Sequence, residues 1–116
     1  MTPKELQSRT KRFAHQCVRT ALSFPKNALG YHLRGQLIRA ATSVAANYRA
    51  ACLAQSKASF IHKVSIVLEE ADECVFWLEF ARDEKIIGQE LTALQKEAGE
   101  ILAIFYTIRK NSRKKE

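Results

Sequence analysis

The chain has 116 residues, of which 47% are hydrophobic, and it carries a formal net charge of +7. That length accommodates one domain with its own core, and that apolar fraction excludes a disordered polymer. The uninterrupted apolar runs are only a few residues long, so no segment is expected to span a bilayer. Because the N-terminal residues lack the apolar stretch of a signal peptide, we expect a cytoplasmic protein without a membrane partner.

The charges are segregated along the chain. Residues 1–63 contain eleven Lys or Arg and a single acid, Glu5, whereas residues 64–108 contain three Lys or Arg and ten acids. Residues 109–116 contain five Lys or Arg and one acid. Segregation this sharp indicates either a partner of opposite charge or pairing between the segments.

The first predicted helix opens with a strong start signal. Thr2 can cap it, Pro3 suits its first turn, and Glu5 completes a capping box. Its apolar positions recur every four or seven residues, at Leu6, Phe13, Cys17 and Phe24. Pro25 disfavours a helical residue before it, so the helix is expected to end there.

Three more helices follow. The second extends to about Ala54 and is rich in small residues from position 40 onwards, so it is expected to contact neighbours on more than one side. Ser56 is the expected N-cap of the third, whose apolar residues repeat at 4-3 spacing as far as Ala81. The fourth carries apolar residues at 3-4 spacing from Leu91 to Ile108.

Four amphipathic helices with short connections predict an all-α fold, an antiparallel four-helix bundle of up-down-up-down topology. We expect the bundle to occupy residues 1–110. Residues 111–116 contain no apolar side chain, so we expect them to form a basic disordered tail.

The tight connection at residues 54–56 predicts ion pairs between the second and third helices. If the two helices fold back on each other there, Arg39 lies opposite residue 71, beside Glu70 and Glu73. Arg49 lies opposite residue 61, near His62. Pairs of this kind contribute only about 0–1 kcal/mol each, but they remove acids from the surface charge.

The first helix and the C-terminal end are the candidate nucleic-acid contacts. Arg9, Arg12 and Arg19 share one face of the helix, which lies away from its apolar positions, and further lysines flank that face. The full predicted set is Lys4, Arg9, Lys11, Arg12, Arg19, Arg109, Lys110, Arg113, Lys114 and Lys115. A basic face that only confers solubility is the competing interpretation, and an acidic protein is the competing partner.

No motif in the sequence indicates catalysis, a metal or a cofactor. The chain contains no Glu-x-x-His pair, nucleophile elbow, glycine-rich phosphate loop or Cys-x-x-Cys pair. The acids Glu69, Glu70 and Glu73 are interpreted as a solvated or salt-bridged face. The three cysteines are interpreted as buried free thiols.

A bulky aromatic run, Phe76, Trp77 and Phe80, exceeds what one apolar seam requires. Core packing and a subunit interface both remain open as its role.

Several runs together resemble the bacterial four helix bundle proteins, also called 23S rRNA-intervening-sequence proteins. They are QLIRAATSVAANYR at residues 36–49, SKASFIHK at residues 56–63, EEADE at residues 69–73 and WLE at residues 77–79. The resemblance covers residues 36–108.

This resemblance implies a cytoplasmic bundle, commonly a ring-shaped homopentamer. The group is also similar to the accessory protein of diversity-generating retroelements, which binds a reverse transcriptase and nucleic acid. The resemblance further implies that five residues are fold or interface positions: Asn47, Arg49, Glu70, Glu73 and Trp77. We therefore predict a non-enzymatic protein that binds nucleic acid, RNA in preference to DNA. A protein-docking scaffold or accessory subunit is the alternative.

Overall fold

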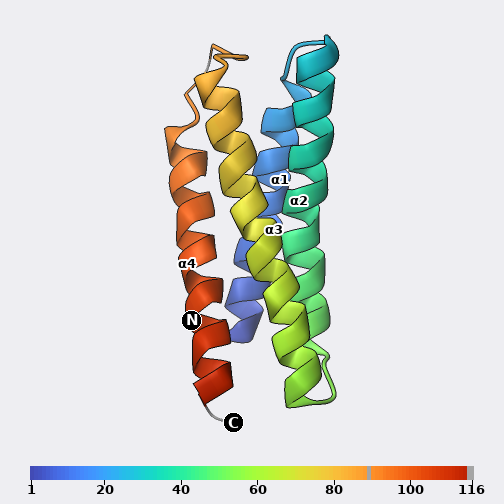
Figure 1. Ribbon diagram of the computed structural model, residues 1–116, viewed down its shortest axis with the longest axis vertical. Helices are drawn as coiled ribbons and strands as arrows, with labels where there is room; N and C mark the ends of the chain where they lie inside the picture. The colour runs from blue at the N-terminus through green and yellow to red at the C-terminus, as the bar shows by residue number, and fades with distance from the viewer. Residues whose placement is uncertain (89, 115–116) are drawn as a thin grey trace.

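The computed structural model describes residues 1–88 and 90–114, and it contains four helices within them. They are α1 (Pro3–Leu22), α2 (Ala28–Cys52), α3 (Lys57–Asp83) and α4 (Thr92–Lys114). The helices run alternately up and down in a rod of 47 × 20 × 20 Å (Figure 1). The predicted antiparallel four-helix bundle is therefore confirmed.

Side-chain caps set the start of each of the first three helices. The Thr2 hydroxyl accepts a hydrogen bond from the Glu5 amide at 3.1 Å, and the Glu5 carboxylate accepts one from the Thr2 amide at 3.1 Å. Ser56 accepts from the Ser59 amide at 3.0 Å. Both predicted caps are confirmed, and Asn27 adds a third cap by accepting from the Gly30 amide at 2.8 Å.

The core consists of one seam of apolar side chains from all four helices. Its largest fully buried members include Phe13 of α1, Leu37 of α2, Leu78 of α3 and Phe105 of α4. Small buried residues, Ala40, Ala41 and Ala51, let α2 pack closely against both α1 and α3. In contrast, α1 contacts α4 only sparsely.

The expected disordered tail is corrected in part, because α4 continues through Lys114. Lys and Arg are good helix formers, and their charge is favourable at a helix C-terminus. Ser112 is half-buried, and its hydroxyl donates a hydrogen bond to the Ile108 carbonyl at 2.8 Å. Lys115 and residue 116 lie outside the described residues.

None of the helices, within the part of the chain that the structure describes, combines the length and apolar character needed to cross a membrane.

Candidate nucleic-acid interface

The basic residues of α1 fall on two different sides of the bundle. On the side that faces α4, carboxylates of α4 neutralise Arg9. The Arg9 guanidinium donates to both carboxylate oxygens of Glu97, at 2.9 Å from Nε and 2.7 Å from Nη2. Nη2 also donates to Glu100 at 2.8 Å. These hydrogen bonds raise the pKa of Arg9 above its usual value, and the bonds to Glu97 contribute most. With a side chain only 21% exposed, Arg9 is not the open phosphate contact that was expected.

Arg12 and Arg19 are exposed, as predicted for a basic outer face. Arg12 nevertheless lines the shallow depression between α1 and α4 together with Glu90 and Glu97. Arg19 lies in the last turn of α1, where a cation stabilises the helix dipole. This side of α1 therefore mixes cations with carboxylates.

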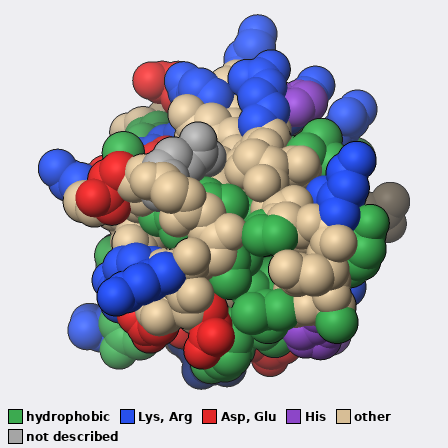
Figure 2. Space-filling model, turned by 90° about the horizontal axis from the view of Figure 1, so that it is seen from above, with side chains coloured by type: hydrophobic (Ala, Val, Ile, Leu, Met, Phe, Trp, Pro, Cys, Tyr) green, Lys and Arg blue, Asp and Glu red, His purple; other side chains and the backbone are tan. Residues whose placement is uncertain are grey.

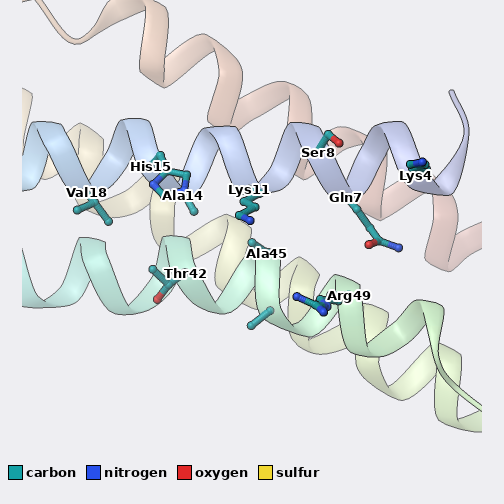
Figure 3. A pocket seen from close by; sticks show the side chains of 11 residues that line it. Lys4, Gln7, Ser8, Lys11, Ala14, His15, Val18, Thr42, Ala45 and Arg49 are labelled. Atoms are coloured by element: carbon teal, nitrogen blue, oxygen red, sulfur yellow. The ribbon is translucent and has the colours of Figure 1, made fainter.

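The other side of α1 forms a groove with α2. The groove has a volume of about 650 Å³, and Lys4, Lys11 and His15 of α1 and Arg49 of α2 supply its charged and titratable side chains. The remaining lining residues are Gln7, Ser8, Ala14, Val18, Thr42, Ala45 and Ala46. Among the residues that the structure describes, no carboxylate lines this groove. Figure 3 shows Gln7 and Lys11 extending from α1 toward α2, with Arg49 on the α2 side.

The sequence explains why few acids lie near these cations. Glu5 is the only acid in residues 1–63, and it is held in the capping box, where the Thr2 amide lowers the pKa of its carboxyl. The floor of the groove is built from alanines, Ala14, Ala45 and Ala46. Because these side chains are short, the long Lys and Arg side chains stand above a shallow apolar surface.

The view down the bundle in Figure 2 shows how charged side chains are distributed over one end of the molecule. Lys and Arg side chains project along the upper and right edges, with a histidine at the upper right. Acidic side chains lie mainly at the left and lower edges, where further Lys and Arg side chains stand beside them. In this view the upper right edge is therefore mainly cationic, whereas cations and carboxylates mix at the left and lower edges.

A second cationic surface lies at the C-terminal end of α4. Arg109, Lys110, Arg113 and Lys114 line a shallow groove together with Leu68 of α3 and Tyr106. These four basic residues were predicted as nucleic-acid contacts. Lys115, the fifth of that group, lies outside the described residues.

The predicted ion pairs between α2 and α3 are confirmed for Arg39. Its Nη1 donates to Glu70 at 2.7 Å, and its Nη2 donates to Glu73. The neighbouring Glu70 carboxylate raises the pKa of Glu73. Asn47 donates to the Ser43 carbonyl and hydroxyl within α2, at 3.0 and 2.9 Å. The Arg39 ion pairs therefore join α2 to α3, the Asn47 bonds stay within α2, and Arg49 lines the α1–α2 groove.

The aromatic run on α3 forms an exposed cluster with α2. Trp77 is half-buried, and its ring meets the edge of His32 with the centroids 5.6 Å apart. Phe76 and Phe80 pack beside it but stay 51% and 38% exposed. Trp77 therefore contributes to packing, while the two phenylalanines present an apolar surface to solvent.

The cysteines are reduced, and two of them are buried. Cys17 and Cys74 are fully buried, and Cys52 is half-buried. Burial raises the pKa of Cys74 to about 12, so its thiol stays protonated and unreactive near neutral pH. Among the described residues, no three His, Cys, Asp or Glu side chains are grouped so that they could hold a metal ion.

Together these features define a small antiparallel bundle with a cationic groove and a separate cationic helix end. The chain belongs to the 23S rRNA-intervening sequence protein family, whose model matches residues 4–107. It is also similar to a solved protein of unknown function from the S23 ribosomal protein family of Bacteroides thetaiotaomicron. That structure has a TM-score of 0.85 and 30% identity, and the match covers 95% of this chain and 99% of the other. No curated protein matches the chain.

Sequence reasoning missed two parts of this interface. His15 and Arg49 line the α1–α2 groove, and no pattern within one helix reveals which neighbour a surface residue faces. Tyr106 was also missed, although a signal was present. It precedes Arg109, Lys110, Arg113 and Lys114 by three, four, seven and eight residues, the spacing of one helical face.

Proposed function

We propose that this protein binds nucleic acid, RNA in preference to DNA, and that it acts without catalysis. The α1–α2 groove is the principal contact surface, and the basic end of α4 is a second one. The observation that supports this most directly is the groove itself, which Lys4, Lys11 and Arg49 line and to which no carboxylate of the described residues contributes.

Phosphates are the ligands that this arrangement suits. Lysine and arginine bind phosphate oxygens and release the counterions that surround a nucleic acid, so affinity falls steeply with salt. The groove presents the cations Lys4, Lys11 and Arg49, which suit contacts with phosphates. Recognition in this proposal is therefore mainly electrostatic. The preference for RNA is supported by the family description and by the ribosomal name of the similar structure.

A binding series with fluorescently labelled RNA at increasing salt tests this proposal. We expect the logarithm of the association constant to fall linearly with the logarithm of the salt concentration, by about 0.7–0.9 per phosphate neutralised. Measuring the affinity for RNA and for DNA of the same length and form tests the preference for RNA. Absence of binding at low salt, or binding without a salt dependence, would contradict the proposal.

The second candidate function is self-association or docking of a protein partner through the aromatic cluster of α3. Phe76 and Phe80 are exposed apolar side chains at the centre of that cluster, and surface aromatics are enriched at protein interfaces. A homo-oligomer, a pentamer by family resemblance, would bury them. A protein partner such as a reverse transcriptase is the other occupant.

Light scattering on the wild type and on a Phe76→Ser, Phe80→Ser variant tests the second candidate. An oligomer that falls to monomers in the variant supports self-association. A wild-type monomer that retains a partner after nuclease treatment supports docking, and a monomer that retains none excludes both.

A further inference from the structure

The basic end of α4 contains an exposed aromatic ring that the preceding assignments leave unused. Tyr106 is 60% exposed, in contrast to the core residue Tyr48, which is 4% exposed and packs against Phe105. Tyr106 shares one helical face with four cations that follow it at three, four, seven and eight residues, namely Arg109, Lys110, Arg113 and Lys114. All five line the same shallow groove.

A helix C-terminus is favourable for cations in its own right, and the helix dipole alone accounts for Arg113 and Lys114 in the last turn of α4. It does not account for an exposed tyrosine two turns earlier. Core packing does not account for it either, since most of the ring faces solvent. An aromatic face beside a row of cations is instead the arrangement by which proteins bind unpaired nucleotides.

The charges on the two sides of Tyr106 differ in sign, and this difference predicts the direction in which a bound nucleic-acid strand runs. On the C-terminal side of the ring, the described residues that line the groove are Leu68 and the four cations, and no carboxylate is among them. On the N-terminal side, Tyr106 borders a second groove that is lined by Glu69 and Asp72 of α3. A polyanion on Tyr106 is therefore attracted toward the C-terminal turns of α4 and repelled from the opposite direction.

We propose that this surface is a binding site for a single-stranded segment of nucleic acid, in which one base stacks on Tyr106 and the adjoining phosphates contact Arg109, Lys110 and Arg113. The inference rests on the proposed function and adds to it the form of the nucleic acid. A base in a duplex is stacked on its neighbours and cannot present its face to the ring, so only an unpaired nucleotide occupies the site.

The test compares binding of a labelled single-stranded RNA with binding of a duplex of the same sequence, for the wild type and three variants. Tyr106→Ala removes the ring and is expected to weaken single-strand binding about ten-fold. Tyr106→Phe keeps the ring and is expected to bind as the wild type does. Tyr31→Ala is the matched control, because Tyr31 is 52% exposed but lies on α2 over Arg34.

Duplex binding separates this inference from the proposed function. If Tyr106→Ala weakens binding of the single strand and leaves the duplex unchanged, the site is supported. Equal losses for both forms, no loss for either, or an equal loss in Tyr106→Phe would overturn it, provided that circular dichroism shows a folded bundle. If the wild type binds neither form at low salt, the proposed function itself fails.

A second substitution independently tests the predicted path of the bound strand away from the acids near Tyr106. Asp72→Asn removes one of the acids that border the ring, and it is expected to tighten single-strand binding by about two-fold. Unchanged or weaker binding would contradict the assigned path of the strand. Glu79→Gln on the same helix is the control, since it removes an exposed acid that does not line either groove at Tyr106.

Discussion

The two sides of α1 carry similar numbers of cations but differ in what faces them. On the α4 side, Arg9 is bound by Glu97 and Glu100 and is largely withdrawn from solvent. On the α2 side, Lys4 and Lys11 line a groove together with Arg49, and none of the described residues that line it is an acid. One helix thus uses one cation, Arg9, to pair with α4 on one side and leaves Lys4 and Lys11 exposed on the other.

This difference shows that net charge is a poor guide to where a ligand binds. For Arg9 the neighbouring helix decides whether the cation is neutralised, because its partners Glu97 and Glu100 both lie on α4. The acids of α4 stand in register with Arg9, whereas α2 contains no acid. Around α1, the described surface that combines cations without carboxylates is therefore the groove between the two acid-poor helices.

The largest expected effect comes from Gly30, which holds the α1–α2 hairpin and hence the groove. A side-chain methyl at this position would collide with the Pro25 carbonyl. We expect Gly30→Ala to destabilise the protein by about 2 kcal/mol, because the backbone of the connection must shift. Gly35→Ala on the same helix is the control, since its methyl meets open space, and it should stabilise by about 0.5–1 kcal/mol. Urea unfolding measures the change in the free energy of unfolding for both variants. If the two changes have the same sign, the close approach of Gly30 to Pro25 does not explain the glycine.

The next effect concerns binding and tests the comparison directly. Replacing Lys4, Lys11 and Arg49 by Gln removes the charge of the groove, and we expect RNA affinity to fall at least about ten-fold at low salt, with a salt slope shallower by about 2. Arg9→Gln serves as the control, because its guanidinium is already neutralised, and it should bind RNA nearly as the wild type does. If Arg9→Gln weakens binding as strongly, the distinction between the two sides of α1 is wrong.

The sequence predicted the fold well because the relevant signals are local. The capping box at Thr2, the cap at Ser56 and the 4-3 apolar repeats each depend on neighbours within a few residues. The pairing of Arg39 with Glu70 and Glu73 was also predictable, because a tight turn fixes which residues of two consecutive helices face each other.

The candidate site was predicted less completely because its charges depend on contacts between helices. No connection joins α1 directly to α4, so nothing in the sequence aligns Arg9 with Glu97, residues 88 positions apart. Arg49 was expected near His62 of the third helix, and the groove that it lines with α1 was not foreseen. The end of α4 was mistaken for a tail because it lacks apolar residues, although Lys and Arg themselves favour helix.

A smaller effect is expected for the Arg9 ion pairs themselves. Arg9→Gln leaves Glu97 and Glu100 without their partner, and because these groups are only partly buried we expect a loss of at most about 1 kcal/mol. A double-mutant cycle with Glu97→Gln isolates the interaction from other effects of each substitution. A coupling energy of zero would mean that the pair contributes nothing to holding α1 against α4.

The smallest effect is a local one at Cys17 of α1. Cys17 and Cys74 are both fully buried, so each reacts with a thiol reagent only when the structure around it opens. If the Arg9 ion pairs fasten α1 to α4, Arg9→Gln should speed labelling of Cys17 about two- to three-fold, an effect of several tenths of a kcal/mol, and leave Cys74 of α3 less affected. Mass spectrometry of the labelled peptides follows both thiols in one sample, with the half-buried Cys52 as an internal reference. Equal acceleration at Cys17 and Cys74 would show that the bundle opens as a whole. It would contradict the hypothesis that the Arg9 ion pairs stabilise the contact of α1 with α4 separately.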